Sequence, residues 1–172
     1  ALNCQMHVEC HRAALGSEPG TLRLPDLAYD EENNFGGVEL TRFVEGHAVP
    51  VWRLDDALDL PRCRLLKIDV EGMERSVLDG ARGTIARHRP LLYVENDRLE
   101  KSDALIGAIE AMGYRLYWHT PAMFNPANFA GDAENLFPHV VSVNMIGIPP
   151  GTAMEMDGFA PVVAGRHPMQ SP

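Results

Sequence analysis

The stretch of sequence that decides the fold is Leu65-Leu66-Lys67-Ile68-Asp69-Val70-Glu71-Gly72. Its first four residues are apolar except for one lysine, which is typical of a strand covered on both faces in a parallel sheet. The acidic residues and the glycine that follow predict a turn out of this strand. An apolar helical face comes next, formed by Met73, Val77, Leu78, Ala81 and Ile85. The pattern therefore predicts a strand, a turn and one helix that ends before Pro90.

The same pattern continues downstream. Residues 91–94 predict a second buried strand, and Ser102 or Asp103 is expected to cap the start of the helix that follows it. Two more strands are predicted at residues 114–119 and 140–148, with a loop of proline, asparagine and phenylalanine residues between them. Because no helix separates these last two strands, we expect them to form an antiparallel pair at one edge. Alternating strands and helices predict an α/β domain with a mostly parallel sheet.

The pattern is weaker upstream. Alternating residues predict three strands, at residues 6–14, 21–24 and 48–54. Asp55 and Asp56 follow the third of these strands and are expected to cap a single helical turn. After Pro149 the sequence has no apolar period, so we expect a loosely held tail. The chain is accordingly divided into one domain over residues 1–150 and a loosely ordered tail over residues 151–172.

Length and composition exclude several classes of protein. The 172 residues suit one domain, and 24 acidic against 15 basic residues give a net charge of −9. This charge disfavours binding to nucleic acid or to an anionic membrane surface. No apolar run is long enough to span a membrane. Three cysteines imply no disulfide framework, so the cytoplasm is the expected location.

Polar residues that could carry chemistry follow the predicted central strands. Asp69 and Glu71 follow the first strand, Glu95 follows the second, and His119 ends the third. In open α/β sheets ligands bind beyond the carboxyl ends of the strands, so these four side chains are candidate catalytic acids and bases. The alternative is that the acidic residues cap the helices that follow them.

Two other features have plainer explanations. Lys67 shares a strand face with Asp69, and because an unpaired buried ammonium is costly, a structural ion pair is favoured over catalysis. The start of the chain holds residue types that can bind zinc: Cys4, His7, Cys10 and His11. Strand alternation would place Cys10 opposite the two histidines, and no second ligand pair follows, so no metal site is predicted.

The motifs resemble those of the FkbM family of methyltransferases. The central residues that carry the resemblance are 66–74, 77–81 and 89–95. Upstream stretches that agree with it are 13–16 with Gly20, 34–37 and 51–58, and downstream ones are 117–119, 124–126, 128–129 and 135–138. The resemblance covers roughly residues 1–150, and its Lys-Ile-Asp-Val-Glu-Gly element is its most specific part.

The resemblance implies a Rossmann-like class I methyltransferase sheet, mostly parallel with an antiparallel edge. It implies S-adenosylmethionine as cofactor and transfer of a methyl group to a hydroxyl oxygen of a small molecule or glycan. It also implies a set of cofactor-binding residues: Ala14, Gly16, Asn34, Gly36 and Asp69. Such a domain opens with a strand and an Asp-x-Gly-x-x-x-Gly loop, which these residues lack. The chain is therefore expected to be the C-terminal portion of the domain, without its first two strands.

Other possibilities remain open at this point. A missing first strand would leave one edge of the strand at residues 65–68 bare, which favours pairing with another chain, so a homo-oligomer is possible. The expected partner is a small-molecule or carbohydrate hydroxyl acceptor, without nucleic acid or membrane. One alternative is a catalytically inactive, methyltransferase-like binding module. Another is a different Rossmann-like nucleotide-binding enzyme, against which the absence of a glycine fingerprint counts.

Overall fold

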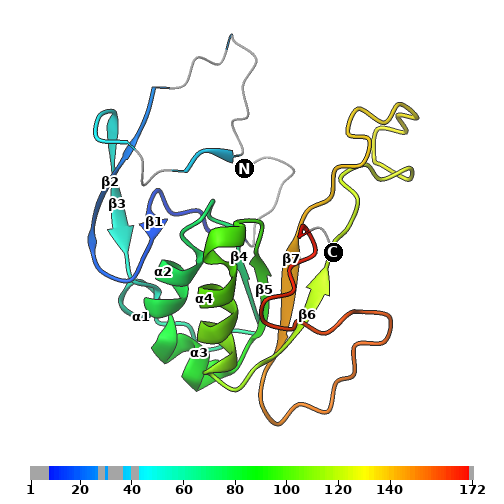
Figure 1. Cartoon of the computed structure of the whole chain (residues 1–172). Helices are drawn as coiled ribbons and strands as arrows, with labels where there is room; N and C mark the ends of the chain where they lie inside the picture. Colours follow the sequence, from blue (N-terminus) through cyan, green and yellow to red (C-terminus); the bar gives the residue numbers. More distant parts are fainter. Residues whose placement is uncertain (1–7, 27–29, 31–36, 40–42, 171–172) are drawn as a thin grey trace.

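The computed structural model describes residues 8–26, 30, 37–39 and 43–170 of the chain. In this part of the chain the strands form a three-stranded and a four-stranded sheet, and helices cover one face of the larger one (Figure 1). None of the described helices combines the length and the apolar character needed to cross a membrane.

The four-stranded sheet has the order β4-β5-β7-β6. Its strands are β4 (Leu65–Ile68), β5 (Leu91–Glu95), β7 (Asn144–Ile148) and β6 (Arg115–His119). β4 and β5 are parallel, whereas β7 is antiparallel to both β5 and β6. The predicted antiparallel pairing of the last two strands is confirmed. The prediction of a mostly parallel sheet is wrong, because β7 returns without a crossover helix and inserts between β5 and β6, which makes the sheet mixed.

Three helices pack on one face of this sheet. They are α2 (Glu74–Asp79), α3 (Arg82–His88) and α4 (Leu99–Glu110) (Figure 1). The prediction of one helix after β4 is wrong, because the chain breaks it between α2 and α3. The break brings Gly80 against the backbone of Gly16, where an added Cβ would lie 2.0 Å from the Gly16 carbonyl oxygen.

The start of α4 also differs from the prediction. The helix begins at Leu99 rather than after a cap at Ser102 or Asp103. Ser102 lies one turn inside the helix and is buried, and its hydroxyl accepts a hydrogen bond of 3.0 Å from the side-chain amide of Asn96. Ser102 therefore binds the end of β5 instead of capping its own helix.

The hydrophobic core lies between the helices and the covered face of the sheet. It is formed by Ile68, Val77, Leu78, Ile85, Leu92, Val94, Leu105, Ile106, Ile109, Leu116, Trp118 and Met145, among others. Along β5 and β6 buried residues alternate with half-buried ones. The opposite face of the sheet therefore presents Lys67, Tyr93, Glu95 and His119, which places the polar side chains away from the helices.

The three-stranded sheet is formed by the first strands of the chain. β1 (Ala14–Leu15) runs parallel to β3 (His47–Trp52), and β2 (Gly20–Leu24) pairs antiparallel with β3. The strand predicted at residues 6–14 is wrong over residues 8–13, which form no strand, and its first two residues lie outside the described part. The other two predicted strands are confirmed with small shifts.

The strand β4 lies at one end of the four-stranded sheet. Among the described strands it pairs only with β5, and the Leu65 side chain is 58% exposed. The segment that follows β7 returns to the other end of the sheet. There the backbone nitrogen of Val162 donates a hydrogen bond of 2.9 Å to the carbonyl of Leu116, and Val162 and His167 are buried.

Asp55 connects the two parts of the fold. It lies in α1 (Leu54–Ala57), but its carboxylate accepts hydrogen bonds of 2.7 Å from the backbone nitrogens of Gly83 and Thr84, in the first turn of α3. The expected cap of its own helical turn is therefore wrong: Asp55 caps α3. Burial alone would raise the pKa of Asp55, but the hydrogen bonds from Gly83 and Thr84 outweigh it and lower the pKa.

Replacing Asp55 with alanine is expected to lower the free energy of unfolding by about 1–2 kcal/mol, the usual cost of a lost helix cap. The matched control is Asp56→Ala, because Asp56 is exposed and forms a surface ion pair with Arg53 at 3.2 Å. The control should change stability by less than about 0.5 kcal/mol. Urea denaturation of both variants at pH 7 measures the difference. Equal effects of the two substitutions would contradict the role of Asp55 as a cap.

Candidate functional site

The candidate site lies at the C-terminal ends of β4, β5 and β6. Asp69 directly follows β4, Glu71 comes two residues later, and Glu95 is the last residue of β5. One carboxylate oxygen from each of these three residues lies within 4.8 Å of the others. The structure therefore brings together three of the four predicted catalytic side chains, and we call this group the carboxylate cluster.

The fourth predicted residue, His119, lies at the same edge of the sheet, in a row of residues paired across three neighbouring strands. Glu95 of β5 and His119 of β6 are both paired in register with Asn144 of β7, which lies between them. Asn144 is 4% exposed, and its side-chain amide donates a hydrogen bond of 2.7 Å to the Ser142 hydroxyl. Nothing in the sequence pattern pointed to Asn144, because its position depends on the insertion of β7 into the sheet.

A tight turn presents Glu71 to the cluster. Glu71 has a φ angle of 52° and Gly72 one of 91°, both in the left-handed region. The buried carboxylate of Glu74 holds the turn by accepting hydrogen bonds of 3.3 Å from the Val70 nitrogen and 2.9 Å from the Gly72 nitrogen. A left-handed conformation at a residue other than glycine is uncommon and is often found at functional sites. The turn thus fixes where Glu71 lies.

Two cations balance part of the negative charge at the cluster. Lys67 forms an ion pair with Asp69, as predicted, although its side chain is largely exposed rather than buried. Arg98 donates a hydrogen bond of 2.7 Å to Glu71 and lies 3.1 Å from the carboxylate of Asp97. Burial raises the pKa of Glu71, and the Arg98 guanidinium opposes that shift. The sequence offered no sign of Arg98 beyond its place after the acidic end of β5.

Among the described residues no cation pairs with Glu95, which is the most perturbed carboxyl group of the cluster. Its Oε2 atom is buried and has no hydrogen-bond partner in the same part of the chain. Burial and the negative charges of Asp69, Asp97, Glu71 and Glu74 raise the pKa of Glu95 from 4.5 to about 8. At neutral pH the group is therefore mainly protonated, and it loses its proton near the pH at which a general base is most effective.

His119 is held by two aromatic side chains. The Tyr93 hydroxyl lies 2.9 Å from Nδ1 of His119, within hydrogen-bond distance. Burial raises the pKa of Tyr93, so its hydroxyl keeps its proton at neutral pH. The ring of Phe159 lies 5.6 Å from that of His119. Tyr93 could have been found from the sequence, because it alternates with Glu95 along β5 and so shares its face.

The predicted cofactor residues other than Asp69 lie elsewhere in the chain. Ala14 is in β1 and Gly16 follows it, where its nitrogen donates a hydrogen bond of 2.9 Å to the Trp52 carbonyl. An added Cβ at Gly16 would lie 2.8 Å from Val51, so the space beside this glycine is filled by the protein. Asn34 and Gly36 lie outside the described residues. Their contacts with a cofactor stay predictions.

The cysteines and histidines near the start of the chain form no cluster in the part that is described. Cys4 and His7 lie outside it, Cys10 is exposed, and His11 lies 3.3 Å from the Glu9 carboxylate. The carboxylate cluster is the group of possible metal-ligating side chains found among the described residues. Its oxygens lie close enough together to hold a divalent cation.

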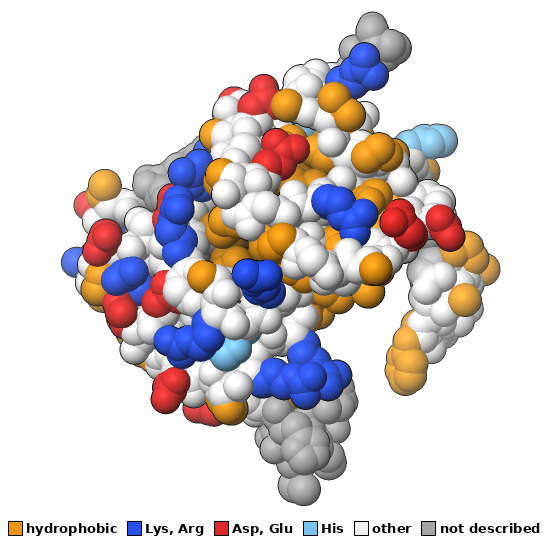
Figure 2. All heavy atoms as spheres, turned by 90° about the horizontal axis from the view of Figure 1, so that it is seen from below, with side chains coloured by type: hydrophobic (Ala, Val, Ile, Leu, Met, Phe, Trp, Pro, Cys, Tyr) orange, Lys and Arg blue, Asp and Glu red, His pale blue; other side chains and the backbone are white. Residues whose placement is uncertain are grey.

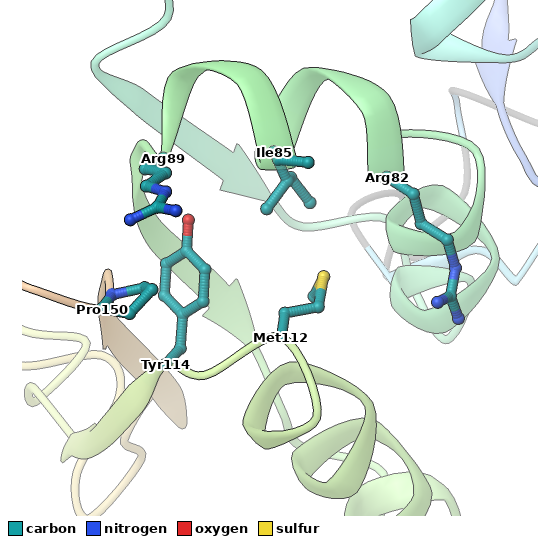
Figure 3. A pocket seen from close by; sticks show the side chains of 7 residues that line it. Arg82, Ile85, Arg89, Met112, Tyr114 and Pro150 are labelled. Carbon is teal, nitrogen blue, oxygen red and sulfur yellow. The ribbon is translucent and has the colours of Figure 1, made fainter.

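A cavity of about 340 Å³ lies at the opposite end of the larger sheet (Figure 3). Ile85 points into it from α3 toward Met112 and Tyr114, and the Arg89 guanidinium lies beside the Tyr114 hydroxyl (Figure 3). Arg89 and Tyr114 lie just before β5 and β6, so the cavity is at the N-terminal ends of the strands. Figure 2 views this end, where basic side chains gather around exposed hydrophobic ones. The cavity is therefore separate from the carboxylate cluster.

Comparison with known proteins assigns the chain to a family. A family model described as the methyltransferase FkbM domain matches residues 7–116, more than half of the chain. The matched region contains Asp69, Glu71 and Glu95, and it ends within β6. Neither the curated proteins nor the solved structures gave a match. The extent of the family match shows that the chain belongs to the FkbM family of methyltransferases.

Proposed function

We propose that this protein is an S-adenosylmethionine-dependent methyltransferase that acts on a hydroxyl oxygen of a small molecule or glycan. The observation that carries the proposal is the state of Glu95. The chain belongs to a methyltransferase family, and the carboxyl group of Glu95 lies at the C-terminal ends of the strands. No cation of the described residues pairs with it, and its pKa is raised to about 8. Removing the proton of a hydroxyl acceptor requires a group of this kind within hydrogen-bond reach.

The negative charge of the carboxylate cluster suits this cofactor. S-adenosylmethionine carries a positive sulfonium, and negative charges from Asp69, Glu71 and Asp97 surround Glu95. The Oε2 atom of Glu95 is buried and has no hydrogen-bond partner among the described residues. The resemblance assigns the cofactor to Ala14, Gly16, Asn34, Gly36 and Asp69; of these, Asp69 belongs to the carboxylate cluster, whereas the space beside Gly16 is filled by Val51. When bound, the cofactor would supply an electrophilic methyl group, so the protein mainly has to align the acceptor and take its proton.

The side chains of the carboxylate cluster and His119 then have different roles. In its ionised form, Glu95 takes the proton of the acceptor hydroxyl. Asp69 and Glu71 are held by Lys67 and Arg98, so they orient and attract rather than accept the proton. His119, fixed by the Tyr93 hydroxyl, contacts the acceptor from the other side of Asn144. Of the four candidate acids and bases, this assignment gives the main role to Glu95.

The finer fold assignment belongs to the same proposal. β5 and β6 are both antiparallel to β7, so β4, β5 and β6 run in one direction, with helices after β4 and β5 packed on one face. This arrangement supports a Rossmann-like class I sheet. A cytoplasmic location, the hydroxylated acceptor and a homo-oligomeric state are proposed with it, on the grounds given from the sequence.

Calorimetric titration with S-adenosylmethionine tests the proposal. In a protein that contains the whole methyltransferase domain we expect binding, and Asp69→Asn should weaken it about tenfold, which corresponds to about 1.4 kcal/mol. The control is Glu110→Gln, which removes an exposed carboxylate at the end of α4 and should leave the dissociation constant unchanged. Binding should be followed by formation of S-adenosylhomocysteine with a panel of hydroxylated sugars. Failure of that protein, without substitutions, to bind the cofactor would contradict the proposal.

A further inference from the structure

The segment that follows β7 runs along the free edge of β6. The Trp118 nitrogen donates a hydrogen bond of 2.8 Å to the carbonyl of Ala160, and the Val162 nitrogen donates one of 2.9 Å to the carbonyl of Leu116. Farther on, the Gly165 nitrogen donates a hydrogen bond of 3.1 Å to the carboxylate of Asp103 in α4. The segment is thus attached to both the sheet and a helix.

Near the end of this segment, His167 is buried close to the C-terminal end of β5. His167 is 6% exposed. Its ring packs edge-on against the ring of Trp118, with 5.1 Å between the ring centroids. The Met169 nitrogen donates a hydrogen bond of 3.1 Å to Nδ1, so Nδ1 carries no hydrogen. Nε2 is then the donor, and it lies 2.6 Å from the backbone carbonyl oxygen of Asn96. Both ring nitrogens are therefore engaged by one tautomer of the neutral imidazole.

The bond from His167 completes the hydrogen bonds of the residue directly after Glu95. The Asn96 nitrogen donates a hydrogen bond of 2.9 Å to the carbonyl of Val143, and its side-chain amide reaches Ser102 and Met145. The backbone carbonyl of Asn96 accepts the bond from Nε2 of His167, and Asn96 is buried. Without His167, the Asn96 carbonyl would lose this hydrogen bond while it stays buried. Because an unpaired buried carbonyl is costly, the backbone at the end of β5 would then tend to shift.

We propose that residues 159–167 form one side of the candidate site, with His167 as a positioning residue that fixes the end of β5 and hence Glu95. Phe159 contributes to the same side, because its ring packs against His119. The inference rests on the proposed function, since it concerns the same site. It also extends beyond the family match, which ends at residue 116 and does not contain this segment.

Hydrogen exchange measured by NMR on the full chain tests the positioning role. In His167→Ala the amide of Asn96 should exchange about tenfold faster or more, because the end of β5 opens locally. The amide of Ile85, bonded to Ala81 within the helical region, is the internal reference and should keep its rate. His167→Gln should restore much of the protection, because a glutamine amide can donate to the Asn96 carbonyl. Met169→Ala, an exposed side chain in the same segment, is the matched control.

Long-range nitrogen–proton spectra of the histidine rings give a second readout that needs no variant. The expected signature of His167 is hydrogen on Nε2 and none on Nδ1. Hydrogen on Nδ1, unchanged protection of Asn96 in His167→Ala, or an equal rise at Asn96 and Ile85 would overturn the proposal. If His167→Ala does not fold, two measurements test the proposal instead. They are the position of the ring hydrogen in the unaltered protein and the exchange rate of the Asn96 amide in His167→Gln. These readouts need no cofactor, so a failure of S-adenosylmethionine to bind would contradict the proposed function alone.

Discussion

Replacing Glu95 with glutamine is expected to lower the rate of methyl transfer at pH 8 by about 10²- to 10⁴-fold, the usual contribution of one general base. Glutamine has nearly the same shape as glutamate, so the packing at the end of β5 should persist. It cannot accept a proton from the acceptor hydroxyl. The rate of the unaltered enzyme should rise with pH up to about 8, as Glu95 loses its proton. The variant should lack this rise.

The same substitution has an effect on stability that requires no acceptor. The pKa of Glu95 is raised from 4.5 to about 8 in the folded protein, so the folded state holds this proton more tightly than the unfolded state. The stability from this proton is fully present below pH 4.5 and is lost as the pH rises through about 8. The unaltered protein should therefore lose thermal stability relative to Glu95→Gln between these two pH values.

Thermal unfolding at pH 5 and pH 9 measures this difference, and Glu110→Gln again serves as the control. Glu110 is exposed at the end of α4, so its substitution should leave the pH dependence of unfolding as it is in the unaltered protein. Parallel pH profiles for the unaltered protein and Glu95→Gln would show that Glu95 titrates normally. The assignment of Glu95 as the base would then lose its physical basis.

Local pattern was enough to place β4, β5 and the acidic residues that follow them. Both strands are short apolar runs bounded by turn residues, and the acidic ends of parallel strands meet at one edge of a sheet. The grouping of Asp69, Glu71 and Glu95 therefore followed from the sequence. Their different roles did not, because these depend on Lys67 and Arg98 reaching two of the three carboxylates.

Features set by distant parts of the chain left no signal in the sequence. β7 has the composition of any buried strand, and only its pairing with β5 and β6 places Asn144 between Glu95 and His119. His167 lies in a segment without apolar period, and its role comes from one bond to Asn96, far away in the sequence. The break between α2 and α3 has the same origin, because helical periodicity continues across it.

Replacing Gly80 with alanine is expected to lower the free energy of unfolding by about 3 kcal/mol, at the upper end of the cost of overpacking. The new Cβ would lie 2.0 Å from the carbonyl oxygen of Gly16 and 3.0 Å from its carbonyl carbon. These are backbone atoms, so no side-chain rotation can relieve the contact. The φ angle of Gly80 is −81°, which alanine adopts without strain, so the cost is steric rather than conformational.

Gly107→Ala is the matched control for this prediction. Gly107 lies inside α4, and an added Cβ there would meet nothing within 4 Å. Because alanine has the higher helix propensity, this control should raise the free energy of unfolding by about 1 kcal/mol. The same chemical change is thus expected to have opposite signs at the two positions, as measured by urea denaturation. Stabilisation by both substitutions would mean that β1 and the α2–α3 break are not in contact, and that the three-stranded sheet is not anchored at Gly16.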